Sequence, residues 1–449
     1  MDESIVLSLL LGVLLPLPLI IVLLRLSSYN PDSRRFHYFT TAAECRAIID
    51  GTHFPGGKKN QLSPYQVRAD VPENQAAKQA FGIRNSFTSP SETESKAFVA
   101  EVQGLTDRKI DWTGIRRACR RAACGAVHDV INKGTRGSIS ANGVRGYTLS
   151  LTEVIQAMTL HALFSILDLS FPGDDIETKH LITLGAMIHR ITMDTERGME
   201  YKIAFIDNRA LHRALSDVFP GLKTDKLLLN RMSPLSLILP AFGPTWRLVR
   251  RMFLELHYRY HHADYQDQGW GSVLSEFAGQ PEARVFHFQR QDEDRVSAEM
   301  LVKEALRLFT PTRHIQRVFQ FEGEEGHVIG AADVEACHLD KKVWGHDATE
   351  FNPDRWRKAS IMQELSFLPF GSRPSLCPAH ARVGPMLVGL LVGSCWDMFK
   401  DMEMRSDDEE EVEGLKAGEG MRYYRGAYDG FYFDLFPGSG TSSVASESP

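Results

Sequence analysis

The sequence contains few cysteines and no cysteine pair with the spacing of a metal site. Its six cysteines, at positions 45, 119, 124, 337, 377 and 395, are spread over 449 residues and include no Cys-x-x-Cys. Such a composition excludes a small disulfide scaffold and argues against structural zinc. It suits a protein whose bulk lies in a reducing compartment.

Excess positive charge, internal repeats and low-complexity linkers are also lacking. The formal net charge is −6 at pH 7, so nucleic acid is not expected as a partner. No linker divides the chain, and we therefore expect one large domain over residues 31–437. A polar tail over residues 438–449 is expected to be disordered.

Long apolar runs occur at one place, the N-terminus. The segment from Ile5 to Leu26 is uncharged except for Arg25 and is long enough to cross a bilayer. Arginines follow this segment whereas acidic residues precede it, which leaves the bulk of the chain in the cytosol. We expect residues 1–30 to form a membrane anchor with a transmembrane helix at about 5–26. The alternative, a cleaved signal peptide, lacks a basic n-region and a small-x-small cleavage site.

The pattern of apolar residues predicts a mainly α structure of the α+β class. A broad apolar surface predicts a core helix over Leu149 to Leu169. A second helix is predicted over Pro234 to Tyr258, with a kink at Pro244, which removes a backbone donor. Residues 36–75 are consistent with a small sheet and loops, and alternating aromatics over Tyr423 to Phe436 predict a terminal hairpin.

The stretch with the clearest chemical character surrounds Cys377. It runs from Phe367 to Ala379 and leads into the apolar segment Val383 to Val392. A cysteine between a tight turn and a helix would place its sulfur near a helix N-terminus, where the dipole favours the thiolate. This makes Cys377 a candidate metal ligand or nucleophile. Taken alone, a lone cysteine in a chain with six is more often a half-buried structural residue.

Two further blocks precede this Cys loop (residues 367–379). In the first, Glu304 and Arg307 lie three residues apart, on one face of a helix. The second has the pattern Phe-x-Pro-x-Arg-Trp and ends at Trp356. In this order and at this spacing, the three blocks resemble the cytochrome P-450 family of haem-thiolate monooxygenases. The resemblance covers residues 36–437, and its specific motifs lie between 304 and 379.

The resemblance implies the cytochrome P-450 fold, a helical triangular prism with a small β-rich lobe. Haem b (iron protoporphyrin IX) would lie between the central helix and the Cys loop. Cys377 would be the axial ligand of the iron, and Phe370 and Gly371 would line the cofactor. Arg313 is expected to hold a haem propionate, whereas Arg317, on the same strand, is expected to be exposed.

The Cys loop departs from the family pattern at three positions. Arg373 replaces a glycine, Ser375 replaces the usual arginine, and Ala379 replaces the glycine after Cys-x. The change at Ser375 removes one contact to a propionate, which Arg373 or Arg382 could supply instead.

Three residues are expected to form a structural lock rather than to take part in chemistry. In the family, the Glu-x-x-Arg pair, here Glu304 and Arg307, meets the arginine of the second block, here Arg355. A guanidinium stays charged and binds a carboxylate in a fixed fork, so the trio can stabilise the core on the cysteine side.

The helix predicted over Pro234 to Tyr258 corresponds to the family's central helix over the haem. Thr245 is the expected catalytic residue, whose hydroxyl would guide protons to bound dioxygen. Pro244 stands where the family commonly has an acid. An ordinary helix residue at a kink is an equally simple interpretation of Thr245.

The implied function is insertion of one oxygen atom from O2 into a small lipophilic substrate. Electrons would come from NADPH through NADPH-cytochrome P-450 reductase. With the anchor, this indicates a single-pass protein of the endoplasmic reticulum membrane with a cytosolic haem domain. The segment from Trp344 to Ala348 suggests a fungal-type microsomal member in secondary metabolite biosynthesis.

Two alternatives remain open. Some members of the family rearrange oxygenated substrates as isomerases and need no external electrons, and Pro244 points weakly that way. The departures at Arg373, Ser375 and Ala379 would also fit a degenerate, non-catalytic relative that has lost its haem.

Overall fold

The computed structural model describes residues 35–133, 136–139, 145–169, 176–196, 203–220, 233–261, 268–287, 295–416 and 427–436. The predicted anchor (1–30, with its helix at 5–26) and the predicted tail (438–449) lie outside these residues. Among the residues described, no helix combines the length and the apolar character of a membrane span.

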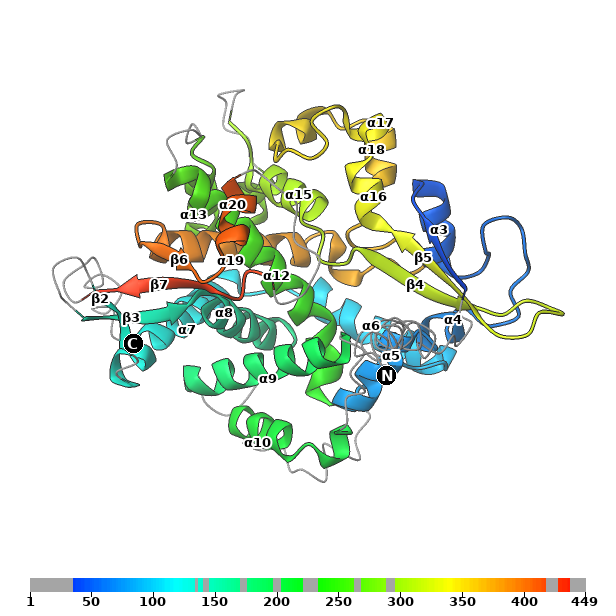
Figure 1. Ribbon diagram of the computed structural model, residues 1–449, viewed down its shortest axis with the longest axis horizontal. Coiled ribbons are helices and arrows are strands. Elements are labelled where there is room, and N and C mark those ends of the chain that lie inside the picture. Colours follow the sequence, from blue (N-terminus) through cyan, green and yellow to red (C-terminus); the bar gives the residue numbers. More distant parts are fainter. Residues whose placement is uncertain are drawn as a thin grey trace, which may run out of the picture.

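Helices form the body of the molecule, as predicted, and lie between two small sheets at opposite sides (Figure 1). The long helices are α6 (Glu92–Asp107), α7 (Trp112–Lys133), α8 (Leu151–Ile166), α9 (Thr178–Glu196), α12 (Pro234–His261) and α19 (Val383–Phe399). The shorter ones are α3 (Ala42–Asp50), α4 (Gln66–Ala69), α5 (Pro72–Phe81), α10 (Arg209–Val218), α13 (Trp270–Gly279), α14 (Ala283–His287), α15 (Ala298–Leu308), α16 (Val334–Leu339), α17 (Lys341–Trp344), α18 (Ile361–Ser366) and α20 (Glu409–Lys416). The described residues also form 3-10 turns at Phe205–Asp207, Pro353–Lys358 and Pro378–His380.

The first sheet has three strands in the order β1-β5-β4. β1 (Arg35–Phe39) is parallel to β5 (Val328–Asp333), which is antiparallel to β4 (His314–Phe319). The second sheet has the order β2-β3-β7-β6, all antiparallel, with bounds Arg136–Ile139, Arg145–Ser150, Phe431–Leu435 and Met404–Ser406. Both sheets therefore join segments that are distant in the sequence.

The predicted core helix is present and buried on nearly every side. Its chain is extended in β3 as far as Ser150, whose side chain accepts a hydrogen bond from the Glu153 N–H and so caps α8. Leu160 and other apolar residues of α8 are fully buried. The second predicted helix, α12, runs three residues beyond Tyr258 and contains both Pro240 and Pro244.

The prediction for residues 36–75 was wrong in part. This region contributes one strand, β1, and loops over residues 51–65, as expected, but it also forms α3, α4 and the first turn of α5, which were not expected. Thr41 caps α3 at its start, and Gly51 ends it with a φ of 76°, a conformation that favours glycine. The rest of the sheet comes from residues after 313, which local patterning could not reveal.

The described part of the predicted terminal hairpin belongs to a larger sheet. Residues 417–426 lie outside the description, and the described part, β7, pairs with β3 on one side and β6 on the other. β7 is thus an inner strand of a sheet, and it brings the end of the chain against α8 and α12.

Helices α13 and α19 approach closely because glycines face the contact. A Cβ atom on Gly393 would lie 2.1 Å from the Leu274 carbonyl oxygen, which is backbone and cannot turn away. On Gly279, at the end of α13, a Cβ would meet nothing within 4 Å.

We therefore expect Gly393→Ala to lower the free energy of unfolding by about 1–3 kcal/mol, because the two helices must separate. Gly279→Ala is the matched control and should change it by less than about 1 kcal/mol. Urea unfolding followed by circular dichroism measures both. Equal stabilities of the two variants would contradict the close approach.

Candidate functional site

The centre of the site is a buried carboxylate on α15. Glu304 and Arg307 have no exposed side-chain surface, and their spacing of three residues lets them pair within the helix. The Arg307 Nη2–H donates to Glu304 Oε1 at 2.7 Å and its Nε–H donates to Oε2 at 3.0 Å. This is the bidentate geometry in which arginine binds a carboxylate most strongly.

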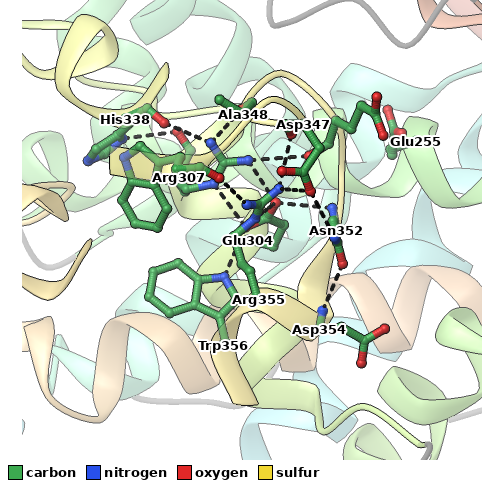
Figure 2. A network of polar contacts seen from close by, with 12 residues as sticks. Glu255, Glu304, Arg307, His338, Asp347, Ala348, Asn352, Asp354, Arg355 and Trp356 are labelled. Carbon is green, nitrogen blue, oxygen red and sulfur yellow. Dashed lines mark hydrogen bonds and ion pairs between the residues drawn. The ribbon is translucent and has the colours of Figure 1, made fainter. Parts of the chain in front are cut away.

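The second sequence block meets the same carboxylate (Figure 2). Arg355 Nε donates to Glu304 Oε1 at 2.9 Å, the Asn352 N–H donates to Oε1 at 3.0 Å, and the Trp356 indole N–H donates to Oε2 at 2.9 Å. The structure thus brings the three predicted lock residues together. It adds the indole of Trp356, the last residue of the second block, and the backbone N–H of Asn352.

The remaining N–H groups of Arg307 and Arg355 donate to residues that lie between the two sequence blocks. Arg307 donates to the carbonyl groups of His338 (2.7 Å) and Ala348 (2.6 Å). Arg355 donates to the carboxylate of Asp347 at 3.0 Å. Burial alone would raise the pKa of Asp347, but the hydrogen bond from Asn352 and the charge of Arg355 outweigh it, so that its pKa lies below the usual range.

His338 connects this network to the Cys loop. Its Nε2 accepts a hydrogen bond from the Leu368 N–H at 2.9 Å, so Nδ1 carries the proton and donates to the Arg307 carbonyl, also at 2.9 Å. The side chain is fully buried, and burial lowers its pKa to about 3. Sequence reasoning missed this neutral histidine because it lies between the motif blocks.

The Cys loop is folded back on itself. The Cys377 N–H donates to the Phe370 carbonyl at 3.0 Å, and the Gly371 N–H donates to the Leu368 carbonyl at 3.0 Å. Gly371 has a φ of 76°, and a Cβ there would lie 3.2 Å from the Ser375 carbonyl oxygen. The Phe370 ring packs on the first turn of α19, where a Cβ on Gly384 would lie 3.0 Å from it.

Cys377 is half-buried and comes six residues before α19. The short 3-10 turn Pro378–His380 follows Cys377 directly. The sequence predicted a sulfur at the N-terminus of the long helix, and this prediction was wrong because α19 begins only at Val383. Burial raises the pKa of Cys377, and the backbone N–H of Ala379 opposes this. The protein alone therefore favours the thiol, whereas a bound metal ion would favour the thiolate.

The arginines proposed for the cofactor lie in different surroundings. Arg313 forms an ion pair with Glu335, and Arg373 is exposed. The expectation for Arg317 was wrong, because this side chain is 6% exposed and donates to the Ile49 carbonyl at 2.9 Å. Burial along β4 does not alternate, because the strand is exposed at His314 and buried from Arg317 to Phe319.

Thr245 lies on α12, which packs against α8 and α19. Its side chain is half-buried and follows Pro244 directly. Among the residues described, no hydrogen bond joins Thr245 to the Cys loop, and the two lie on separate elements.

The residues present fit a haem group. Cys377 offers a half-buried sulfur in a loop that is closed by the backbone hydrogen bonds of Gly371 and Cys377. Phe370 is an apolar neighbour, and the buried Arg317 is a cation without a carboxylate within 4.0 Å among the described residues. Thiolate, apolar wall and cation are the donor set that an iron porphyrin with two propionates requires.

The lowered pKa of His338 makes the free energy of unfolding depend on pH. Between its folded pKa of about 3 and its unfolded pKa of about 6.5, the unfolded chain binds the proton and the folded chain does not. The contribution of neutral His338 to stability is therefore complete above about pH 6.5 and is lost as the pH falls. We expect His338→Gln to remove about 1.4 kcal/mol per pH unit of this slope between pH 6 and 5. Urea unfolding of both proteins at several pH values measures it, and parallel curves would contradict the assignment.

The Glu304 network gives a second prediction. Glu304→Gln keeps the shape of the side chain but leaves the buried Arg307 without its carboxylate and Arg355 with that of Asp347 alone, so we expect a loss of about 3–5 kcal/mol in unfolding free energy. Glu299→Gln, on the same helix, is the matched control. Glu299 pairs at the surface with His287 and Lys303, and its loss should cost at most about 1 kcal/mol. Thermal and urea unfolding measure both variants, and equal losses would contradict the central role of Glu304.

Comparison with known proteins agrees with this geometry. The family model described as "Cytochrome P-450" matches residues 293–378, which include all three blocks except the last residue of the third. Among curated proteins, putative cytochrome P-450 CYP13A4 of Caenorhabditis elegans is 35% identical over 89 residues, which are 18% of this chain and 17% of the relative. Cytochrome P-450 71A19 of Arabidopsis thaliana is 29% identical over 145 residues, 29% of this chain and 30% of the relative. The chain thus matches less than a third of the length of these relatives.

The fold is shared over a greater length. A solved structure of cytochrome P-450SP alpha (CYP152B1), a single-residue mutant, has a TM-score of 0.51 and covers 90% of this chain and 92% of its own. Its complex with (R)-ibuprophen has the same TM-score, with 89% and 90% coverage. Both are 14% identical in sequence, so this likeness shows the cytochrome P-450 fold alone.

Proposed function

We propose that this chain is a haem-thiolate monooxygenase, from the cytochrome P-450 family that the family model, the curated relatives and the fold together support. The single observation that carries the proposal is the connection from Glu304 through Arg307 and His338 to the loop of Cys377. A network this buried, which ends at the N–H of Leu368 in the loop that carries Cys377, suits the retention of a haem.

In this proposal Cys377 would hold the haem iron through its sulfur. A haem bound by a thiolate supplies, when present, the chemistry that favours cleavage of the O–O bond. The hydrogen bond from the Cys377 N–H to the Phe370 carbonyl keeps the loop closed, and the Phe370 ring packs on the first turn of α19. Glu304, Arg307 and Arg355 act as the structural lock and position the loop without touching a reacting atom.

Thr245 is proposed as the group that holds a proton on the distal helix. Its hydroxyl can both donate and accept a hydrogen bond, which a proton relay requires. Pro244 removes one backbone donor from α12 just before it, so a neighbouring carbonyl is left to bind water or substrate.

The proposal extends to the substrate, the redox partner and the location of the protein in the cell. We propose a small lipophilic substrate, with electrons from NADPH through NADPH-cytochrome P-450 reductase. The apolar segment from Ile5 to Leu26 would anchor the protein in the endoplasmic reticulum membrane with the haem domain in the cytosol. A role in secondary metabolite biosynthesis, of the fungal microsomal type, is part of the proposal, although the relatives named above come from a nematode and a plant.

One observation favours a second candidate function. Pro244 occupies the place of the acid that the family commonly uses to deliver protons to dioxygen. An isomerase that rearranges an oxygenated substrate needs neither that acid nor external electrons. The two functions therefore differ in their demand for NADPH.

The first test is the reduced carbon monoxide difference spectrum of the full chain in membranes. We expect the long-wavelength Soret band from which the family takes its name, and its loss in Cys377→Ala, because a thiolate ligand causes that shift. Cys124→Ala is the control, since Cys124 is also half-buried but lies on α7. A folded wild-type protein without bound haem would sink both enzyme functions and leave the degenerate relative.

The second test separates the two enzymes. Purified holoprotein is given candidate lipophilic substrates and hydroperoxide substrates, each with and without NADPH and reductase. Oxygenated product that appears only with NADPH and reductase supports the monooxygenase. Rearranged product formed without either would establish the isomerase.

A further inference from the structure

Two buried cysteines are in contact where α3 packs on α16. Cys45 lies on α3 and has no exposed surface, and Cys337 lies on α16 and is 2% exposed. Their sulfur atoms are 3.3 Å apart, although 292 residues separate them in the sequence. Neither cysteine has a role in the proposed function.

Backbone carbonyl groups at the end of β1 fix the position of both thiols. The Cys45 S–H donates to the Phe39 carbonyl at 3.0 Å, and the Cys337 S–H donates to the Thr40 carbonyl at 3.1 Å. Cys45 Sγ also lies 3.7 Å from the carbonyl oxygen of Asp333, the residue that caps the start of α16. These contacts hold the two sulfurs at one place between the two helices.

Direct contact with a second sulfur of its own kind distinguishes this cysteine pair (Cys45 and Cys337) from other buried cysteines. Cys119 Sγ lies 3.7 Å from the Met158 carbonyl oxygen, and Cys395 Sγ lies 3.6 Å from the Met158 sulfur. Such cysteines act as small apolar side chains. A disulfide joins two sulfurs about 2.0 Å apart, so each sulfur of the cysteine pair would have to move by less than about 1 Å to form one.

We propose that the cysteine pair is a modification site, at which hydrogen peroxide converts the two thiols into a reversible disulfide that clamps α3 to α16. The peroxide is small enough to reach a buried thiol when this part of the fold opens locally. A dithiol reductant reverses the bond by thiol–disulfide exchange. The inference goes beyond the proposed function and does not require a haem.

The oxidation proceeds in two steps. In the first, one sulfur attacks an oxygen of the peroxide, the O–O bond breaks, and the leaving hydroxide takes the thiol proton as water, which leaves a sulfenic acid. In the second, the other sulfur attacks the sulfenic sulfur, and the S–S bond forms as the S–O bond breaks. The hydroxide that leaves takes the second thiol proton as another water. The two sulfurs together lose two electrons, which reduce the peroxide to water.

The cysteine pair resists oxidation while the fold is closed. Contact with Cys337, followed by burial, raises the pKa of Cys45, so its sulfur is a thiol at neutral pH. Because the thiolate is the reactive form, brief contact with peroxide leaves the pair reduced. This agrees with a chain whose bulk is expected in a reducing compartment, where the disulfide would form only under sustained oxidation.

The disulfide would strengthen the support of the Cys loop. His338 follows Cys337 directly on α16 and accepts the N–H of Leu368. Leu368 belongs to the same apolar cluster as both cysteines. A bond between α3 and α16 restricts the unfolded chain over the long segment that it closes, and it fixes the helix that carries His338.

Mass spectrometry of the full chain tests the site. The protein is treated with hydrogen peroxide, unfolded, alkylated and digested with trypsin without reductant. Cys45 then lies in the peptide 36–46 and Cys337 in the peptide 318–341. We expect the two peptides to be linked, with the loss of two hydrogen atoms, and to be separated by dithiothreitol. Sulfoxide at the exposed Met362 shows that the peroxide has acted.

Thermal unfolding tests the clamp. Peroxide-treated wild-type protein should unfold roughly 2–4 °C above the same sample after dithiothreitol, because the disulfide restricts the unfolded chain. Cys45→Ala and Cys337→Ala should lose this difference. Cys119→Ala is the matched control, since Cys119 also has no exposed surface, and it should keep the difference. The comparison within wild-type protein stands even if an alanine variant does not fold.

Three outcomes would contradict the proposal. Recovery of Cys45 and Cys337 as alkylated thiols or as sulfinic or sulfonic acids, in protein whose Met362 is oxidised, would exclude the modification site. Linked peptides without a rise in unfolding temperature would exclude the clamp. Loss of the difference in Cys119→Ala as well would show that oxidation elsewhere causes it. A wild-type protein without haem would sink the proposed function but leave each of these results as decisive as before.

Discussion

The structure depends on the desolvation of one carboxylate. Glu304 has lost all contact with water, and its two oxygens accept five hydrogen bonds, from Arg307 (two), Arg355, Asn352 and Trp356. A buried charge is tolerated only when its hydrogen bonds are complete, so the helix α15 and the segment of residues 352–356 must be in place together. This makes the arrangement cooperative: either segment alone would leave charges unpaired in the core.

A chain of hydrogen bonds, each with a fixed donor and acceptor, connects this carboxylate to the Cys loop. Arg307 is held by Glu304, its carbonyl accepts the proton of His338 Nδ1, and His338 Nε2 accepts the N–H of Leu368. A charged imidazole could not accept that last bond, and burial keeps the ring neutral. The cysteine that the proposed haem needs is therefore positioned by residues on α15 and α16, well before it in the sequence, as Figure 2 shows for the network around Arg307.

Much of the fold and part of the site could be predicted from the sequence. Helices α8 and α12 follow from broad apolar surfaces, which are local properties, and the trio of Glu304, Arg307 and Arg355 was predicted from the order of the blocks. His338 and the buried Arg317 were missed for one reason. Their roles come from partners far along the chain, such as Leu368 and Ile49, which no local pattern encodes. The first sheet was misjudged likewise, because β1 pairs with β5 almost 300 residues later.

The central claim is that the Glu304 network holds the Cys loop through His338, and amide hydrogen exchange at Leu368 tests it most directly. We expect the Leu368 N–H to exchange slowly in wild-type protein and much faster in Glu304→Gln, under conditions where the amides of α8 stay protected in both. Such a selective loss would show that the lock controls the loop. Equal protection of Leu368 in the two proteins would contradict the account, because the loop would then be held by contacts that do not involve the buried carboxylate.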